Sequence, residues 1–490
     1  MRKNCSTKIT SWSNGIFLVM LIALGACSKT STSGGGGGAN AITAFSFQAA
    51  GNKIPVNSQA AINGANISLF LPPGSNTGAL IATFTVSGNA TVTVGGVTQT
   101  SGVTPNNFTS PVTYTVTTPG GQPQNFSVSV TTGIQAIDQG MTAFMSQYNI
   151  PGMAIAITLD DKLVYVNSYG QASTENNQPV TSQSLFRISS LSKQITSAAI
   201  MRLLDQGKLS LNSTVFGNGS ILGNTYGAQP YGPGVTNITV GELLHHTEGG
   251  WADDGTDAFG QNFSYTIPQL MTWQLNNVPL LDTIPGRSYH YSQFGYTVLG
   301  RVIEKITGLS YFQAVQQLVL QPSGITDMQI AGNTLAARLP NEVEYYGQNN
   351  EDPYYIPVSR MDAANGWVAS ATDLAKFLVH VDGLSNLTIL SPNAMKVMTT
   401  GSYANPRYGC GWELNQFNIF HHGNWPGTGA TQAITTQNGN FNYVILANTG
   451  SNDPNFSGNM DNIFWNAIGN IQIWPGYDLF QQQAASEKTN

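Results

Sequence analysis

The spacing of apolar residues changes near Gly133, and this change divides the chain into two kinds of structure. Before Gly133, apolar and polar residues alternate in short runs separated by Gly, Pro and Asn clusters. Such alternation is typical of strands that bury one face. Across residues 134–147, apolar residues recur at helical spacing and predict an amphipathic helix. We therefore expect an all-β module followed by a mixed domain.

The alternating segment spans residues 41–132. Its runs lie at residues 44–47, 67–71, 82–86, 91–94, 112–116 and 126–130. Short strands at this spacing predict a β-sandwich. The segment resembles the immunoglobulin-like modules of exported bacterial proteins, which implies the role of a spacer. Binding of glycan or cell wall is the alternative.

The N-terminus has the pattern of an export signal. Basic residues precede an apolar run at residues 16–24, which is too short to span a bilayer but fits a signal-peptide core. The sequence Leu-Gly-Ala-Cys at residues 24–27 resembles a bacterial lipobox, which implies removal of residues 1–26 and a lipid on Cys27. An ordinary signal peptide is the alternative. Residues 27–40, with five consecutive glycines, predict a flexible tether.

These features predict a protein of the bacterial cell envelope, held to the membrane by an N-terminal lipid. Ser28 follows Cys27 where an aspartate often retains lipoproteins in the inner membrane, so we expect the outer membrane. Lipidation of Cys27 and removal of Cys5 leave Cys410 alone, and we expect no intramolecular disulfide. A formal charge of −6 without a basic patch argues against nucleic acid as a partner.

A serine and a lysine at a predicted helix start indicate nucleophilic catalysis. Ser190 and Lys193 lie three residues apart, just before a helical pattern at residues 194–206. This spacing puts both side chains on one helix face. A serine hydroxyl needs a neighbour to accept its proton, and a buried lysine with a lowered pKa can do so. We identify Ser190 as the candidate nucleophile and Lys193 as its activating partner. A polar helix cap beside a solvated lysine is the structural alternative.

Further characteristic segments occur in a fixed order along the chain. They lie at residues 150–152 (Ile-Pro-Gly), 186–188 (Phe-Arg-Ile), 243–249 (Leu-Leu-His-His-Thr-Glu-Gly), 285–286 (Pro-Gly), 291–293 (Tyr-Ser-Gln), 366–374, 408–412 and 421–423 (His-His-Gly). With the Ser-x-x-Lys pair, they make residues 134–455 similar to the serine β-lactamase and penicillin-binding-protein superfamily. The branch they resemble holds class C β-lactamases, D-alanyl-D-alanine carboxypeptidases and family VIII esterases.

This resemblance implies an α+β fold for residues 133–480. The expected β-lactamase/transpeptidase-like domain has an antiparallel sheet flanked by helices and an all-helical region. The chain shows no Gly-x-Ser-x-Gly elbow, which argues against an α/β-hydrolase.

With the Ser-x-x-Lys pair counted as the first catalytic landmark, the second begins with Tyr291. In the family, a tyrosine opens a Tyr-x-Asn motif, helps to activate the serine and protonates the leaving group, so the resemblance implies a catalytic role for Tyr291. Gln293 stands where the family has asparagine, which keeps the amide on a longer arm and leaves its substrate contact open. The alternative is that Tyr291 is a buried aromatic residue before a helix starting near Phe294.

The third landmark is a predicted edge strand that ends in His-His-Gly. The family usually has Lys-Thr-Gly there, and its esterases and peptidases often have His-x-Gly. The resemblance implies that His421 lines the site, that Gly423 leaves room for substrate, and that backbone N–H groups of Ser190 and Asn424 form an oxyanion hole. Alternation lets only one of His421 and His422 face the site, and both assignments stay open.

Two pairs of adjacent histidines, 245–246 and 421–422, raise the question of a metal. The sequence contains no His-Glu-x-x-His or His-x-His-x-Asp pattern, and the family uses no metal. We expect no cofactor and a structural role for the first pair, with a ligand role as the alternative. Glu248 stands where serine is usual, and the sequence offers no reason for it.

The implied reaction is acyl transfer through a serine ester. Esterases, D-amino-acid peptidases and β-lactamases share these residues. We predict an enzyme of the esterase or D-alanyl-D-alanine carboxypeptidase type that prefers small esters or D-amino-acid amides, including peptidoglycan-derived D-peptides, over penicillins. The reason is that a neutral histidine offers a substrate carboxylate no permanent cation. We also expect His421 to gain a proton by about pH 5.5 and then favour cephalosporins. The alternatives are a β-lactamase and a catalytically weak penicillin-recognising or wall-binding protein.

Overall fold

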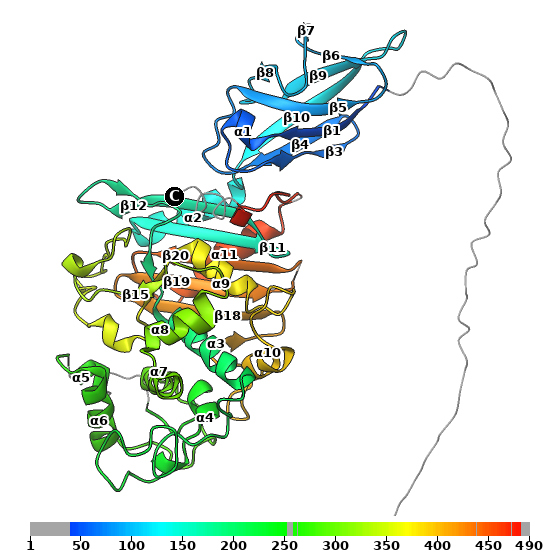
Figure 1. The fold of residues 1–490 in the computed structure, drawn as a ribbon. Helices are drawn as coiled ribbons and strands as arrows, with labels where there is room; N and C mark the ends of the chain where they lie inside the picture. Colours follow the sequence, from blue (N-terminus) through cyan, green and yellow to red (C-terminus); the bar gives the residue numbers. More distant parts are fainter. Residues whose placement is uncertain (1–39, 252–257, 262, 438, 472, 482–490) are drawn as a thin grey trace, which may run out of the picture.

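The computed structural model describes residues 40–251, 258–261, 263–437, 439–471 and 473–481. The predicted signal peptide, Cys27 and all of the tether except Asn40 lie outside these residues. In the described part of the chain, no helix combines the length and apolar character needed to cross a bilayer. A β-module at one end adjoins a larger mixed domain (Figure 1).

The β-module consists of two facing sheets with strand orders β2-β1-β5-β8 and β3-β4-β10-β9-β6-β7. Its strands are β1 Ile42–Phe47, β2 Ser58–Gln59, β3 Ala61–Asn63, β4 Asn66–Leu71, β5 Leu80–Val86, β6 Thr91–Val94, β7 Val97–Thr98, β8 Pro105–Asn106, β9 Val112–Thr117 and β10 Gln124–Thr132, with a short helix α1 Ala49–Asn52. Edge-on aromatic pairs fill the space between the sheets, with Phe45 against Tyr114 at 5.2 Å and Phe47 against Phe108 at 5.1 Å. The predicted all-β module is confirmed.

The larger domain is built on an antiparallel sheet. In the described chain its seven strands have the order β13-β12-β11-β20-β19-β18-β17. Their bounds are β11 Gly152–Leu159, β12 Lys162–Ser173, β13 Gln178–Pro179, β17 Glu413–Leu414, β18 Asn418–Trp425, β19 Thr428–Thr435 and β20 Phe441–Ala447. A small second sheet joins β14 Phe186–Arg187, β15 Gln329–Ile330 and β16 Trp367–Ala369.

Helices cover both faces of the large sheet, so its central strands are apolar on both sides. Met153, Ile155 and Ile157 of β11 enter the core beneath α2 and α11, whereas Ala154 and Ala156 enter the core that contains α3 and α9. The α-helices are α2 Gln135–Tyr148, α3 Ser192–Asp205, α4 Val240–Leu244, α5 Ala258–Gln261, α6 Ile267–Asn277, α7 Gln293–Thr307, α8 Tyr311–Val315, α9 Ala371–Val379, α10 Pro392–Met398 and α11 Phe456–Ile468. Short 3-10 helices are η1 Ser189–Leu191, η2 Val235–Asn237, η4 Leu335–Ala337 and η5 Val358–Met361, and η3 Gln316–Leu320 is a π-helical turn.

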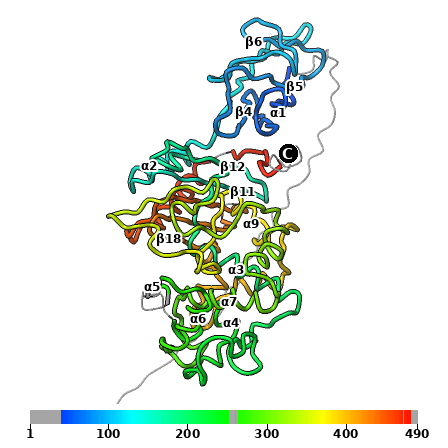
Figure 2. Tube along the Cα trace, turned by 60° about the vertical axis from the view of Figure 1, so that its left-hand side comes forward, coloured from blue at the N-terminus to red at the C-terminus, as the bar shows by residue number. Residues whose placement is uncertain are grey.

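A helical region built around α4, α5, α6 and α7 lies at the end of the molecule opposite the β-module (Figures 1 and 2). The predicted α+β fold, with an antiparallel sheet, flanking helices and a helical region, is confirmed. The sheet and the helical region meet at α3, whose residues 192–201 are all buried. The start of α3 is therefore the point where both parts of the domain can contribute side chains to one site.

Candidate active site

The turn before α3 presents Ser190 in a strained backbone. Ser190 is the middle residue of η1, and Ser189 before it has φ 47°, in the left-handed region that residues other than glycine seldom adopt. Strain of this kind persists only where the surrounding structure imposes it, and it gathers at functional sites.

Gly423 allows strand β18 to lie directly against this turn. A Cβ at Gly423 would stand 2.6 Å from the carbonyl oxygen of Ile188 and 3.0 Å from the Cβ of Ser189. The first distance is too short for any side chain unless the backbone shifts, and the second is tighter than most Cβ contacts. Gly423 therefore makes room for the nucleophile turn, and its role in leaving room for substrate stays a prediction.

Three predicted residues meet at the Ser190 hydroxyl. Tyr291 donates a hydrogen bond to the Ser190 Oγ at 2.8 Å, and the Lys193 Nζ donates to the same oxygen at 3.2 Å. Ser190 is 8% exposed and Lys193 is 0% exposed. The structure therefore places both proton carriers within reach of the nucleophile, in a site largely closed to water.

Lys193 is held from several sides. Its Nζ also donates to the Gln293 Oε1 at 2.7 Å and to the Ala364 carbonyl at 3.1 Å. It lies 4.8 Å from the centre of the Tyr291 ring, which places the ammonium over the negative face of the ring. These contacts fix the Nζ beside Ser190 and Tyr291, so it can take part with Tyr291 in proton transfer without a change of position.

Asn365 is a site residue that the sequence analysis missed. The Ser190 Oγ donates to the Asn365 Oδ1 at 3.1 Å, and the Asn365 Nδ2 donates to the Gln293 Oε1 at 2.6 Å. The longer arm of Gln293 thus reaches back to Lys193 and Asn365. The sequence signal for Asn365 was its position directly before the characteristic segment at residues 366–374. Nothing in the local sequence showed that its side chain would face Ser190.

The two histidines of β18 face opposite sides of the sheet. The His421 ring lies 6.1 Å from the Tyr291 ring, on the site side. His422 points toward α11, where its Nε2 meets the Asp461 Oδ2 at 2.7 Å. Burial lowers the pKa of His422, but the hydrogen bond and charge of Asp461 outweigh burial and raise it overall. His421 is therefore the histidine on the site side.

The expected protonation of His421 near pH 5.5 is wrong. Burial, followed by the charge of Lys193, lowers the pKa of His421 to about 3. The ring is 3% exposed, and both of its nitrogens are already hydrogen-bonded, to Tyr408 and to the His422 carbonyl. His421 therefore stays neutral across the working range of most enzymes.

Asn424 uses its side chain to fix the end of β18. Its Nδ2 donates to the Ser451 carbonyl at 2.6 Å, and its Oδ1 accepts from the Ser451 backbone N–H at 3.1 Å. The backbone N–H of Asn424 remains the group predicted for the oxyanion hole. Gly423, the residue before Asn424, lies against Ser189, the residue before Ser190.

The two residues of the first histidine pair have different contacts. His245 bonds the carbonyls of Gly241 and Thr400, and His246 lies in contact with Tyr291, with ring centres 4.4 Å apart. Within the described ranges, no cluster of three or more His, Cys, Asp or Glu side chains could hold a metal ion. Glu248 is fully buried, and burial raises its pKa to about 8.

Arg187 anchors the strand that leads into the nucleophile turn. Its guanidinium lies over the rings of Tyr345 and Tyr354, at 4.3 and 4.9 Å, and donates to the carbonyls of Pro353 and Gly332. The Arg187 backbone N–H donates to the Tyr345 hydroxyl at 2.9 Å. Cation–π and hydrogen-bonding contacts thus join the approach to Ser190 to the long loop that contains both tyrosines.

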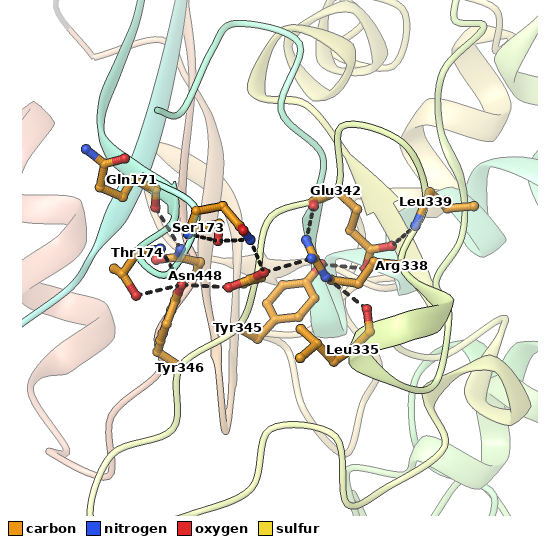
Figure 3. A network of polar contacts seen from close by, with 12 residues as sticks. Gln171, Ser173, Thr174, Leu335, Arg338, Leu339, Glu342, Tyr345, Tyr346 and Asn448 are labelled. Atoms are coloured by element: carbon orange, nitrogen blue, oxygen red, sulfur yellow. Dashed lines mark hydrogen bonds and ion pairs between the residues drawn. The ribbon is translucent and has the colours of Figure 1, made fainter. Parts of the chain in front are cut away.

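A polar network holds this loop against the large sheet (Figure 3). The Arg338 guanidinium pairs with Glu344 at 2.9 Å, and the Tyr346 hydroxyl donates to Glu344 and accepts from the Thr174 backbone N–H. The Asn448 Nδ2 donates to the Gln171 carbonyl, which ties β20 to β12. The loop that contains Tyr345 is therefore fixed to the sheet by polar contacts.

Comparison with known proteins finds two matching family models. The family model "Beta-lactamase" matches residues 135–468, and the model "SGBP, N-terminal" matches residues 42–131. Penicillin-binding protein 4* of Bacillus subtilis is 26% identical, over 54% of this chain and 61% of that protein. A putative D-alanyl-D-alanine carboxypeptidase of Escherichia coli O157:H7 is 24% identical, over 54% of this chain and 68% of that protein.

Among solved structures, the D-amino acid amidase of Ochrobactrum anthropi SV3 superposes with a TM-score of 0.56 at 20% identity. The match covers 69% of this chain and 98% of the amidase, and it shows a shared fold. The matched family model covers more than half of the chain and contains Ser190, Lys193, Tyr291 and His421. The chain therefore belongs to the beta-lactamase family of serine hydrolases and contains a β-sandwich module before the family domain.

Proposed function

We propose that this hydrolase cleaves esters or D-amino-acid amides through an acyl-enzyme on Ser190. The observation that carries the proposal is the convergence of the Tyr291 hydroxyl and the Lys193 ammonium on one serine oxygen, at 2.8 and 3.2 Å. A serine becomes an effective nucleophile when a positioned group accepts its proton during attack. In the reactive form one member of this pair has given up its own proton, as a phenolate beside an ammonium or a phenol beside a neutral amine. That group accepts the serine proton while the other stabilises the resulting charge.

The reaction proceeds in two halves. The Ser190 Oγ forms a bond to the substrate carbonyl carbon, and its proton passes to the Tyr291–Lys193 pair. Backbone N–H groups of Ser190 and Asn424 stabilise the oxyanion. The bond to the leaving alcohol or amine then breaks, and that group takes the proton from the pair. Water repeats the sequence in the second half and releases the acid, which restores the Ser190 hydroxyl.

The neutral state of His421 supports uncharged substrates. A substrate carboxylate beside the scissile bond is best held by a charged donor, since such a hydrogen bond is worth roughly 1.5–3 kcal/mol against about 0.5–1.5 kcal/mol for a neutral donor. Burial and the charge of Lys193 lower the pKa of His421 to about 3, so the His421 ring supplies no charge. Neutral esters and the amides of D-amino acids need no such partner, and peptidoglycan-derived peptides with an uncharged group at this place also qualify.

A turnover screen tests the proposal. The purified chain would be assayed with short-chain nitrophenyl esters, D-amino-acid amides, D-alanyl-D-alanine peptides and a chromogenic cephalosporin, with Ser190→Ala as the blank. We expect ester or amide turnover well above the cephalosporin rate. A faster cephalosporin rate would make the protein a β-lactamase. Failure of a fluorophosphonate probe to label Ser190 would favour a penicillin-recognising or wall-binding protein.

We also propose that the protein is exported and attached to the outer membrane through a lipid on Cys27. The sequence Leu-Gly-Ala-Cys at residues 24–27 and the glycine tether support this placement. The β-module would then act as a spacer between the lipid and the hydrolase domain, with glycan binding as the alternative. Fatty-acid labelling lost in Cys27→Ala would support the anchor, and equal labelling of that variant would reject it.

A further inference from the structure

An unbroken line of hydrogen bonds joins the second and third landmarks behind the site. The Ser292 backbone N–H donates to the His246 Nδ1 at 3.0 Å, and the His246 Nε2 meets the Tyr408 hydroxyl at 3.1 Å. The Tyr408 hydroxyl meets the His421 Nε2 at 3.2 Å, and the His421 Nδ1 meets the His422 carbonyl at 2.7 Å. His246, Tyr408 and His421 are each at most 3% exposed.

The two ends of the line fix the position of every proton in it. A backbone N–H can only donate, and a carbonyl oxygen can only accept. His246 must therefore accept at Nδ1 and carry its proton on Nε2, from which it donates to Tyr408. Tyr408 then donates its own proton to the His421 Nε2. His421 carries its proton on Nδ1 and donates to the His422 carbonyl, so one set of tautomers satisfies all four bonds.

A further proton cannot enter without breaking a bond. A proton on the His246 Nδ1 would face the Ser292 N–H directly. A proton on the His421 Nε2 would face the Tyr408 hydroxyl, which already accepts from His246, and would leave the Tyr408 hydrogen without an acceptor. An unpaired polar group at this depth destabilises the folded chain, and an unpaired charge destabilises it further.

The surroundings oppose a positive charge as well. The titratable groups that face the line are Lys193 on α3, His245 after α4, Tyr289 and Tyr291 before α7, Tyr296 on α7, Cys410 before β17, Glu413 on β17 and His422 on β18. Burial and then the charge of Lys193 lower the pKa of both His246 and His421. The Glu413 carboxylate lies 3.9 Å from the Nδ1 of His422, whose ring points away from the site.

We propose that His246 and Tyr408 are positioning residues that lock His421 in its neutral Nδ1–H tautomer. The lock makes the third landmark an uncharged wall, and it thereby selects substrates without a carboxylate beside the scissile bond. The same hydrogen-bonded line also holds the backbone N–H of Ser292, the residue after Tyr291. It therefore links the position of Tyr291 to that of His421. The inference deepens the proposed function and, in its substrate part, rests on it.

Nuclear magnetic resonance of the histidine nitrogens tests the lock itself. The chain has six histidines, so a ¹⁵N-histidine sample of the full chain gives few signals, and His246→Gln and His421→Gln assign two of them by loss. We expect His246 as the Nε2–H tautomer and His421 as the Nδ1–H tautomer, with neither protonating between about pH 8 and pH 5. The opposite tautomer of His421, or its protonation in that range, would overturn the proposal whether or not the protein turns over esters.

Tyr408→Phe tests the consequence for specificity. The change keeps the ring but removes the donor that occupies the His421 Nε2. A substrate carboxylate beside this free nitrogen then favours uptake of a proton, against the effects of burial and of Lys193. The assay is the ratio of kcat/KM for 3-carboxy-4-nitrophenyl butyrate to that for 4-nitrophenyl butyrate, at pH 7.5 and pH 5.5. We expect an unchanged ratio in the natural enzyme and an increase of roughly tenfold at the lower pH in the variant, the step from a neutral to a charge-assisted hydrogen bond.

Tyr165→Phe is the matched control. It also removes a buried tyrosine hydroxyl, which in this case bonds Asp138 beneath the opposite face of the sheet. We expect its ratio to stay flat, like that of the natural enzyme. A flat ratio in a folded Tyr408→Phe, or an equal rise in both variants, would overturn the selection of substrates. Absence of all ester turnover in the natural enzyme, with the expected tautomers in place, would instead count against the proposed function.

Discussion

The β-module and the hydrolase domain bury different kinds of side chain. Residues 41–132 contain one charged residue, Lys53, and no Asp, Glu or His. The module's core is a cluster of aliphatic and aromatic side chains. The hydrolase domain instead buries charged and titratable groups around its centre, among them Lys193, His246, Glu248 and His421. One region uses burial only to hold itself together, and the other also uses it to fix protonation states.

This difference separates stability from chemistry. Burying an ionisable group costs free energy unless it is paired or neutral, whereas an apolar core carries no such cost. The hydrolase domain accepts that cost where its titratable residues surround Ser190. Substitutions there should change turnover or its pH dependence, and substitutions in the β-module should change stability alone.

The largest expected effect is that of Ser190→Ala. This change removes the atom that forms the acyl-enzyme, so kcat should fall by at least about 10⁴-fold. The melting temperature should stay near that of the natural protein, because a small buried hydroxyl is lost without a cavity of any size. Nitrophenyl ester hydrolysis and thermal melting measure the two quantities. Substantial residual turnover would mean that another residue is the nucleophile.

Lys193→Ala and Tyr291→Phe should each lower kcat by roughly 10²–10⁴-fold, the range for a positioned acid–base group. Both groups contact the same serine oxygen, so the loss in the double variant should be smaller than the product of the single losses. Measuring kcat of the two single variants and of the double variant on one ester, relative to the natural enzyme, tests this. Losses that multiply would show that lysine and tyrosine act independently.

Glu248→Gln should change stability in a pH-dependent manner. Burial raises the pKa of Glu248 to about 8, above its value of about 4.5 in an unfolded chain. The stabilising contribution of its neutral form is complete below about pH 4.5 and is lost as the pH rises through about 8. The glutamine variant lacks this loss, so its melting temperature should exceed that of the natural protein at pH 8.5 by several degrees more than at pH 5.5.

The β-module supplies the internal control for this measurement. It has no carboxylate or histidine, so any separate melting transition of the module should not move between the two pH values. An identical response of the natural protein and the glutamine variant would show that Glu248 is charged in the folded state.

Local patterns in the sequence predicted the elements that depend on local forces. The alternating runs became the main strands of the module, and the helical spacing at residues 134–147 became α2 Gln135–Tyr148. The helix expected near Phe294 begins one residue earlier, at Gln293. Ser190 and Lys193 could be placed together because a single helix start positions both.

Contacts between distant segments were beyond such patterns. Asn365 meets Ser190 across 175 positions of sequence, and Tyr408 meets His246 across 162. Neither pair has a spacing that constrains it, because tertiary packing alone brings the partners together. The protonation of His421 was misjudged for the same reason, since its burial and its bond to Tyr408 appear only in the folded chain.

The smallest expected effect on catalysis is that of removing the β-module. A chain that starts at Gly133 should keep kcat within about twofold, because the module meets the hydrolase domain away from Ser190. Its Leu71 carbonyl accepts from the Gly133 N–H, and Val56 and Phe70 pack against the domain. The module stands beside β12, and β11, β20 and β19 lie between that strand and β18. Removal should therefore lower only the melting temperature.

Phe47→Ala in the full chain is the companion variant. Phe47 is 0% exposed in the module core, and loss of a buried aromatic side chain costs roughly 3–5 kcal/mol, a large share of the stability of so small a unit. The module should then melt early while nitrophenyl ester turnover is unchanged. A drop in kcat of about tenfold or more, in either variant, would mean that the module helps to shape the site and that the two regions are not separate in function.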